Sequence, residues 1–143
     1  MKNKRAFAAA LVAGLAGIAT APAFADDALY ADLGQKDGIA KIVDAATANF
    51  LSDSRIKMTF DNTNIDKFKV SLVSQLCVVA GGPCKYTGQS MHDAHKGLHL
   101  TNADFNAVVE DLQSAMADCG VGFATQNRFL ARQAPYQHQV VTR

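Results

Sequence analysis

The chain has 143 residues, of which 49% are hydrophobic and 19% charged, and its net charge at pH 7 is +1. This composition is typical of a globular protein rather than a disordered one, and the length gives room for one domain of ordinary size. A charge so close to zero, with no block of basic residues, argues against nucleic acid as a partner.

The first 25 residues have the pattern of a secretory signal peptide. Three basic residues in Met1-Lys-Asn-Lys-Arg5 precede an uncharged apolar run over residues 6–21, and Ala23-Phe24-Ala25 supplies the small residues of a cleavage site. A membrane anchor is the alternative, but it would need about 20 apolar residues and no Ala-x-Ala ending. We therefore predict a signal peptide over residues 1–25 and a mature domain over 26–143.

Cleavage near Ala25 would change the net charge of the chain and the compartment in which it works. It removes three basic residues and no acidic one, so the net charge falls from +1 to −2. No segment after residue 25 is long and apolar enough to span a bilayer. We expect the mature chain to be periplasmic in a Gram-negative cell, or otherwise secreted.

Beyond residue 25, hydrophobic residues recur with helical spacing. The predicted helices cover approximately residues 38–51, 65–79, 90–98, 102–119 and 124–133. Thr63 and Asn64 are candidate caps of the second helix, and Thr101 to Asp104 resembles a capping box. Ala134-Pro135 breaks or kinks the last helix before a polar tail. Since no stretch alternates as a strand does, the predicted fold class is all-α.

Three cysteines, Cys77, Cys84 and Cys119, belong to the predicted exported chain. An odd number leaves at least one thiol without a partner in the same chain. Cys77 lies near the end of the predicted helix 65–79, and Cys84 follows in the Gly-Gly-Pro loop. Two interpretations remain open: a short-loop disulfide between Cys77 and Cys84, or three cysteines that are small buried thiols.

Three of the four histidines fall within residues 92–99. On a short helix, Met91, Ala94, His95 and Leu98 share one face, which places His95 among apolar side chains. A buried imidazole there needs a hydrogen-bond acceptor or a metal as its partner. Two ligand arrangements are possible.

The first arrangement is a zinc or copper site formed by His92, His95 and His99 at helical spacing. Its weakness is Gly97, which tends to end the helix before His99. Solvent-facing positions are the simpler interpretation of His92 and His99.

In the second arrangement His95 alone ligates the iron of a haem. Met91 and Leu98 would pack on one face of the haem, and the wide apolar helix 65–79 would close the other. The absence of a Cys-x-x-Cys-His motif indicates haem b. The candidate contacts are Phe60, Phe68, Leu72, Leu76, Met91 and Leu98, although Phe60 and Phe68 also fit the pattern of ordinary core residues.

Several motifs occur in the order and spacing of a known family, the group I truncated globins. They are Leu29-Tyr30-x-x-Leu33-Gly34, Asp53-x-Arg55-Ile56-Lys57-x-x-Phe60, Gly81-Gly82, Lys85-Tyr86-x-Gly88-x-x-Met91-x-x-Ala94-His95-Lys96, Phe105 to Leu112, and Gly120-Val121. The mature chain resembles this family over essentially its whole length. The resemblance implies a two-over-two helical sandwich, with His95 as the proximal haem ligand and Phe60 wedged against the haem. The double glycine and Gly88 correspond to hinges that position the short proximal helix.

The side of the haem opposite His95 departs from the family pattern. Thr47 stands where relatives commonly carry a tyrosine that hydrogen-bonds a gas ligand, and helix 65–79 contributes Phe68, Ser71 and Leu72 where polar side chains are common. Gln75 is a further polar candidate. With few hydrogen-bond donors, we expect rapid oxygen release and relatively good binding of NO or CO.

His138 corresponds by chain position to the region where some relatives bond a histidine to a haem vinyl group. Its place near the end of the chain, after Pro135, favours a solvated side chain.

The leading functional prediction is a haem b protein that binds a diatomic gas (O₂, NO or CO) for carriage, sensing or scavenging. The alternative is an enzyme at the same site, a haem-dependent NO dioxygenase or a peroxidase-like enzyme. It would need an exported electron donor, since the chain has no reductase domain or flavin motif. A third hypothesis is a haem-free Zn or Cu protein using His92, His95 and His99.

Overall fold

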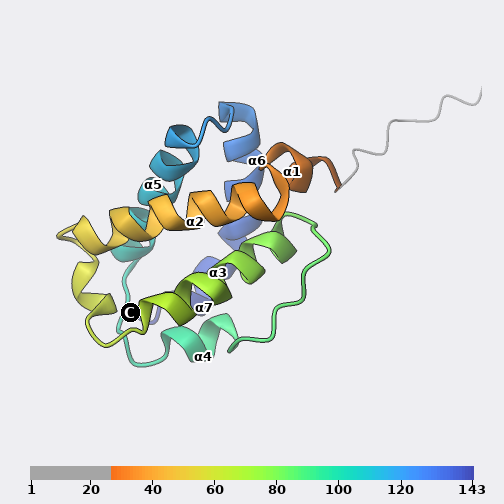
Figure 1. The fold of residues 1–143 in the computed structure, drawn as a ribbon. Coiled ribbons are helices and arrows are strands. Elements are labelled where there is room, and N and C mark those ends of the chain that lie inside the picture. Colours follow the sequence, from red (N-terminus) through yellow and green to blue (C-terminus); the bar gives the residue numbers. More distant parts are fainter. Residues whose placement is uncertain (1–26) are drawn as a thin grey trace, which may run out of the picture.

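The computed structural model describes residues 27–143, and the predicted signal peptide lies outside this range. The described residues form helices and loops with no strand among them, which confirms the all-α class (Figure 1). The α-helices are α1 (Asp27–Asp32), α2 (Gln35–Ser52), α3 (Ile65–Val79), α4 (Met91–His95), α5 (Asn102–Asp118), α6 (Phe123–Gln133) and α7 (Gln137–Val140); η1 (Lys57–Phe60) and η2 (Ala134–Tyr136) are 3₁₀ helices. No helix in this range has both the length and the apolar character needed to cross a bilayer.

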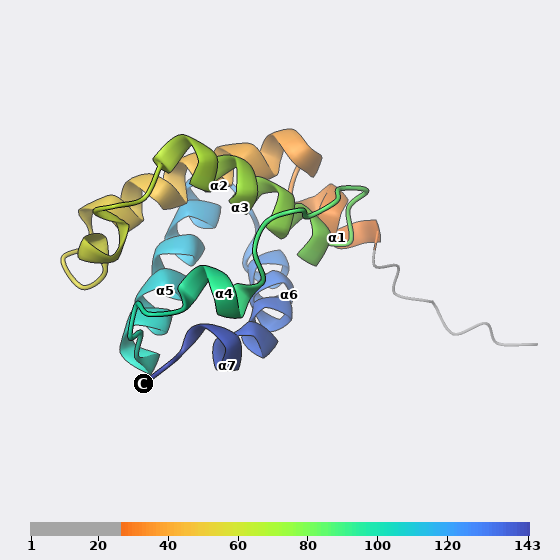
Figure 2. The same ribbon diagram turned by 90° about the horizontal axis from the view of Figure 1, so that it is seen from below.

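The four long helices form two crossed layers. α2 packs along α3, and this pair lies across α5 and α6 (Figures 1 and 2). Where the layers meet, Val43 and Ala46 of α2 and Ala115 and Met116 of α5 have no exposed surface. Burial of apolar surface is the main stabilising contribution of such an interface, and small residues let helices approach closely. The layers form the two-over-two sandwich that the resemblance implied.

Two short helices at the ends of the domain are missing from the sequence prediction. α1 buries Leu29 and packs against α2 and α6. The stretch from Ala134 onward, where the sequence predicts a break followed by a polar tail, forms η2 and α7, and α7 packs against α4 and α5. Val140 is buried there, and the amides of the last two residues donate to the carbonyl oxygen of Leu100. Helices this short depend on tertiary contacts, which a sequence pattern does not reveal.

The predicted helix caps are present. The Asn64 side chain accepts a hydrogen bond from the Lys67 amide at 3.0 Å at the start of α3. At α5, Thr101 and Asp104 form the capping box, with the Asp104 carboxylate 2.8 Å from the Thr101 amide. Hydrogen bonds from Thr101 hold the pKa of Asp104 below its usual value. These caps fix where the two helices begin.

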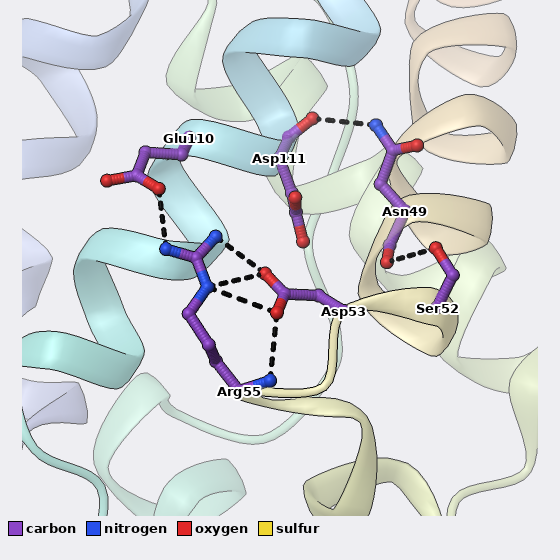
Figure 3. Close-up of polar contacts among 6 residues, drawn as sticks. All are labelled: Asn49, Ser52, Asp53, Arg55, Glu110 and Asp111. Carbon is purple, nitrogen blue, oxygen red and sulfur yellow. Dashed lines mark hydrogen bonds and ion pairs between the residues drawn. The ribbon is translucent and has the colours of Figure 1, made fainter.

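An ionic cluster holds the corner between α2 and η1 against α5 (Figure 3). Arg55 pairs with Asp53 (Nη2 to Oδ2, 2.6 Å) and with Glu110 of α5 (Nη1 to Oε2, 2.7 Å). Beside them, the Asn49 amide donates to the Asp111 carbonyl oxygen at 3.1 Å. Hydrogen bonds from Arg55 lower the pKa of Asp53. Exposed ion pairs add little stability, so the main effect of the cluster is on the geometry of the corner that leads into η1.

The surroundings of the Asp111 carboxyl group disfavour its charged form. Its Oδ2 atom is buried without a hydrogen-bond partner, and burial together with the charge of Asp53 raises its pKa (Figure 3). Because the native state holds this proton more tightly than the unfolded state, stability falls as the pH rises from the ordinary carboxyl pKa through the raised one. Asp111→Asn is therefore expected to raise the urea midpoint at pH 7.

The pH dependence of this gain separates it from unrelated effects. Below about pH 4 the wild-type carboxyl group is protonated and the gain should shrink toward zero. Glu110→Gln is the matched control, because Glu110 is exposed and its loss removes only a surface ion pair. A gain for Asp111→Asn that is the same at both pH values would contradict the electrostatic explanation.

Candidate functional site

The short helix α4 presents His95. The helix begins after Ser90, whose hydroxyl oxygen accepts from the Asp93 amide at 3.0 Å. His95 is half-buried, and its Nδ1 atom lies 2.7 Å from the carbonyl oxygen of Met91. Since a carbonyl oxygen can only accept, the proton of the neutral ring is on Nδ1 and the lone pair of Nε2 is free. This arrangement orients the imidazole as a metal ligand.

The other two histidines of this region do not join His95. α4 ends at His95 and not at Leu98, so the predicted helix over residues 90–98 is too long. Gly97 has a φ of +81° and His99 a φ of +53°, which lies in the left-handed region, so the helical spacing is lost. His92 is exposed beside Asp93.

The three-histidine hypothesis is accordingly not supported. Within residues 27–143, no three His, Cys, Asp or Glu side chains are grouped so that they could hold a metal ion. The ligand set that remains is one imidazole with a free Nε2 atom.

Three phenylalanines form a connected cluster between α2, η1 and α3. Phe60 stacks on Phe50 with ring centroids 5.8 Å apart, and Phe68 meets Phe60 edge to face at 5.4 Å. Phe50 is buried, whereas Phe60 and Phe68 are half-buried. Aromatic pairs in these geometries stabilise each other. The cluster therefore fixes the orientation of two of the predicted haem contacts.

The predicted contact residues differ in exposure. Phe60, Phe68, Leu72 and Met91 are half-buried, Leu76 is 3% exposed within the core, and Leu98 is 42% exposed beyond the end of α4. A group of partly exposed apolar side chains is a candidate ligand-binding surface only where its members are contiguous, as Phe60 and Phe68 are. Leu76 instead supports α3 from the core side.

Polar groups on the side predicted to face the gas are few. Thr47 is buried on α2, and its hydroxyl donates to the Val43 carbonyl oxygen of the same helix at 2.7 Å. Ser71 is exposed on α3, and Gln75 is 92% buried. The hydroxyl proton of Thr47 is thus already used within α2.

The residues in place fit a haem. The imidazole of His95 supplies the Nε2 nitrogen, and half-buried apolar side chains of η1, α3 and α4 supply a surface of the kind that covers a flat apolar cofactor. Figure 1 shows α4 on the side of α3 opposite to α2, and α4 itself packs mainly against α7.

Sequence reasoning missed the aromatic stacking, left the pairing of the cysteines open, and favoured the solvated position of His138. Phe50, which stacks on Phe60, lies within the predicted helix 38–51, and its spacing from Phe60 and Phe68 gives no signal of contact. Cys77 and Cys84 are joined by a disulfide, and Cys119 is free and exposed. His138 is exposed on α7.

Comparisons with known proteins agree with this fold. Residues 28–142 match the family model described as bacterial-like globin. A group 1 truncated haemoglobin of Tetrahymena pyriformis is 33% identical over 99 residues, which are 69% of this chain and 82% of that protein. One from Mycolicibacterium paratuberculosis is 27% identical over 114 residues, covering 80% of this chain and 84% of the relative.

Two solved structures extend the likeness to three dimensions. The Fe(III) form of the Tetrahymena pyriformis truncated haemoglobin has a TM-score of 0.78 at 29% identity, covering 80% of this chain and 98% of that one. The 2/2 haemoglobin of Synechococcus, solved in the cyanomet state with covalently attached haem, has a TM-score of 0.73 at 26% identity over the same shares. The chain belongs to the bacterial-like globins and, among them, to the group 1 truncated haemoglobins.

Proposed function

We propose that the protein holds haem b through the Nε2 atom of His95 and binds a diatomic gas on the opposite face of the haem, toward α3. Family membership supports the haem and the gas ligand, so the protein is a haem-binding globin. The observation that carries the role of His95 is the 2.7 Å contact of its Nδ1 atom with the Met91 carbonyl oxygen, which leaves Nε2 free. The bound haem would supply an iron with an open coordination position for the gas.

The chain's own residues would hold and shield the haem. Phe60, Phe68, Leu72 and Met91 would cover its faces and exclude water, which strengthens every polar contact inside the site. Leu98, which is 42% exposed beyond the end of α4, is a further candidate to cover the haem. Thr47, Ser71 and Gln75 are the candidate polar groups near the gas.

The scarcity of free donors should set the gas preference. Because the Thr47 hydroxyl already donates to Val43, only Ser71 and Gln75 remain as candidate donors to the partial negative charge that oxygen gains on binding. We expect a Soret band when the mature chain is purified with haem available, reversible CO binding, and oxygen release faster than in relatives that carry a tyrosine at this position. Stopped-flow displacement of oxygen by CO measures this rate.

Each outcome bears on a different part of the proposal. No Soret band would overturn the haem function. A Soret band with slow oxygen release would leave the haem function standing and contradict the apolar-pocket hypothesis. No feature of the described residues favours the NO dioxygenase or peroxidase-like alternative, and the external electron donor that either would need has no support.

We also propose that the protein is exported after cleavage near Ala25. The basic, apolar and Ala-x-Ala pattern of residues 1–25 supports export. The Cys77–Cys84 disulfide adds support, since such bonds persist mainly in oxidising compartments outside the cytosol. The mass of the chain isolated from the native host should correspond to a protein that begins at Asp26, and a cytosolic chain of full length would contradict export.

A further inference from the structure

We propose that the Cys77–Cys84 disulfide positions His95, so that oxidation of the two thiols completes the haem site and couples tight haem binding to export. This inference rests on the proposed function, because it concerns the same site. It identifies Cys77 and Cys84 as positioning residues for His95.

The disulfide ties the connection between α3 and α4 to the core. Cys77 lies in the last turns of α3 and has no exposed surface, while Cys84 is half-buried in the 80–90 segment that leads from α3 to α4. Gly82 lies so close to this bond that a Cβ atom there would come within 2.7 Å of the Cys77 sulfur and 2.5 Å of the Tyr30 ring. The start of the segment is thus packed tightly between α1 and the bridge.

The rest of the segment has few other anchors. The amides of residues 80–82 bond back to α3, and Ser90 caps α4. Between them, no hydrogen bond in the described structure joins residues 83–89 to another part of the fold. The one side-chain bond of this described stretch, from the Tyr86 hydroxyl to the Gln89 carbonyl oxygen, stays within it. Packing and the bond at Cys84 therefore carry the attachment of this stretch.

α4 depends on this attachment. Five residues are too few for a helix to be stable alone, so its position follows from what holds its ends and its face. α4 packs against α7, which is itself a helix of four residues. The disulfide joins α3, the helix predicted to face the gas, to the segment that leads into α4 and so to His95. Breaking it should let His95 sample more positions and lower the haem affinity.

The chemistry requires an exchange partner of one class, an exported oxidoreductase that carries a reactive disulfide. One thiolate of the chain attacks that disulfide, and the second thiolate then attacks the mixed disulfide, forming the Cys77–Cys84 bond. The two thiols lose two electrons and two protons in total, and the oxidoreductase is left as a dithiol. Cys84 is the accessible partner, because Cys77 is fully buried. In the reducing cytosol the precursor keeps both thiols and a looser site.

The test compares the oxidised mature chain with its dithiothreitol-reduced form and with Cys84→Ser, which leaves buried Cys77 in place. Cys119→Ser is the matched control, because Cys119 is free and exposed. We expect haem transfer to an acceptor globin to be about 10-fold faster after reduction and in Cys84→Ser, in the range seen when a group that orients a metal ligand is lost. Reoxidation should restore the slow rate, and Cys119→Ser should match the wild type.

Two readouts separate positioning from general destabilisation. In the haem-free chain, amide hydrogen exchange over residues 83–96 should become faster in Cys84→Ser, while Ile39→Val, which weakens the core of α2, should leave this segment unchanged. In the ferrous haem-loaded chain, the iron–histidine stretching band should broaden or shift only when the disulfide is lost.

Equal haem transfer and equal exchange with and without the bond would overturn the inference while the proposed function stands. Absence of haem from every form would overturn the proposed function and the inference with it. Faster exchange spread evenly over all helices would show a stability effect alone and would also overturn the positioning role.

Discussion

Replacing His95 by glycine is expected to lower the haem affinity by more than about 100-fold. Loss of a group that merely orients a metal ligand costs about 10- to 100-fold, and this variant removes the ligand itself. The imidazole of His95 is already oriented by the Met91 carbonyl oxygen, so the wild type has no ordering cost to meet when haem binds. The measurement is a titration of the haem-free chain with haem, followed by the Soret band.

Added imidazole provides an independent check on the role of His95. If the loss is that of an iron ligand, free imidazole should occupy the space left in His95→Gly and restore part of the Soret band. His92→Ala is the matched control on the same helix, because His92 is exposed and contacts only Asp93. An unchanged affinity in His95→Gly, or an equal loss in His92→Ala, would contradict the assignment of His95.

The parts of the fold that depend on local sequence were predictable. The long helices carry apolar residues at helical spacing, and their starts at Asn64 and Thr101 carry cap residues whose hydrogen bonds need no distant partner. The short helices α1 and α7 were not predictable from the sequence, because they are held by packing against other helices. The helix over residues 90–98 was predicted too long: Gly97 was expected to end it before His99, whereas α4 ends at His95.

The candidate site also has features that were predictable from the sequence and features that were not. His95 stands out in the sequence as a polar residue on an apolar face, and the structure adds the contact with Met91 that explains its orientation. The stacking of Phe60 on Phe50 joins residues from two elements, and no spacing rule reveals it. The pairing of Cys77 with Cys84 was one of two open possibilities, because sequence separation alone does not fix the distance between two sulfurs.

Thr47 bears on the gas preference through what its hydroxyl does in the folded chain. A threonine has one proton to donate, and here it goes to Val43. Thr47→Val keeps the shape of the side chain and removes only this internal hydrogen bond. We therefore expect oxygen release from Thr47→Val to match that of the wild type, since the removed group was not available to the gas.

Thr47→Tyr is the opposite change, and it should slow oxygen release by roughly 10- to 100-fold. A phenol can extend beyond the helix backbone and donate to the partly negative gas ligand, and a hydrogen bond to a charged group contributes about 1.5–3 kcal/mol, or roughly that factor in rate. Thr47 is only 4% exposed, so part of the gain will be offset by the space that the larger ring needs.

Carbon monoxide distinguishes a hydrogen bond from a change in packing. CO gains little charge on binding, so its release should change much less than that of oxygen in Thr47→Tyr. Parallel slowing of both gases would indicate that the ring obstructs escape, and an unchanged oxygen rate would mean that residue 47 does not face the ligand. Only selective slowing of oxygen supports the conclusion that the scarcity of free donors, with the Thr47 proton held by Val43, sets the gas preference of this globin.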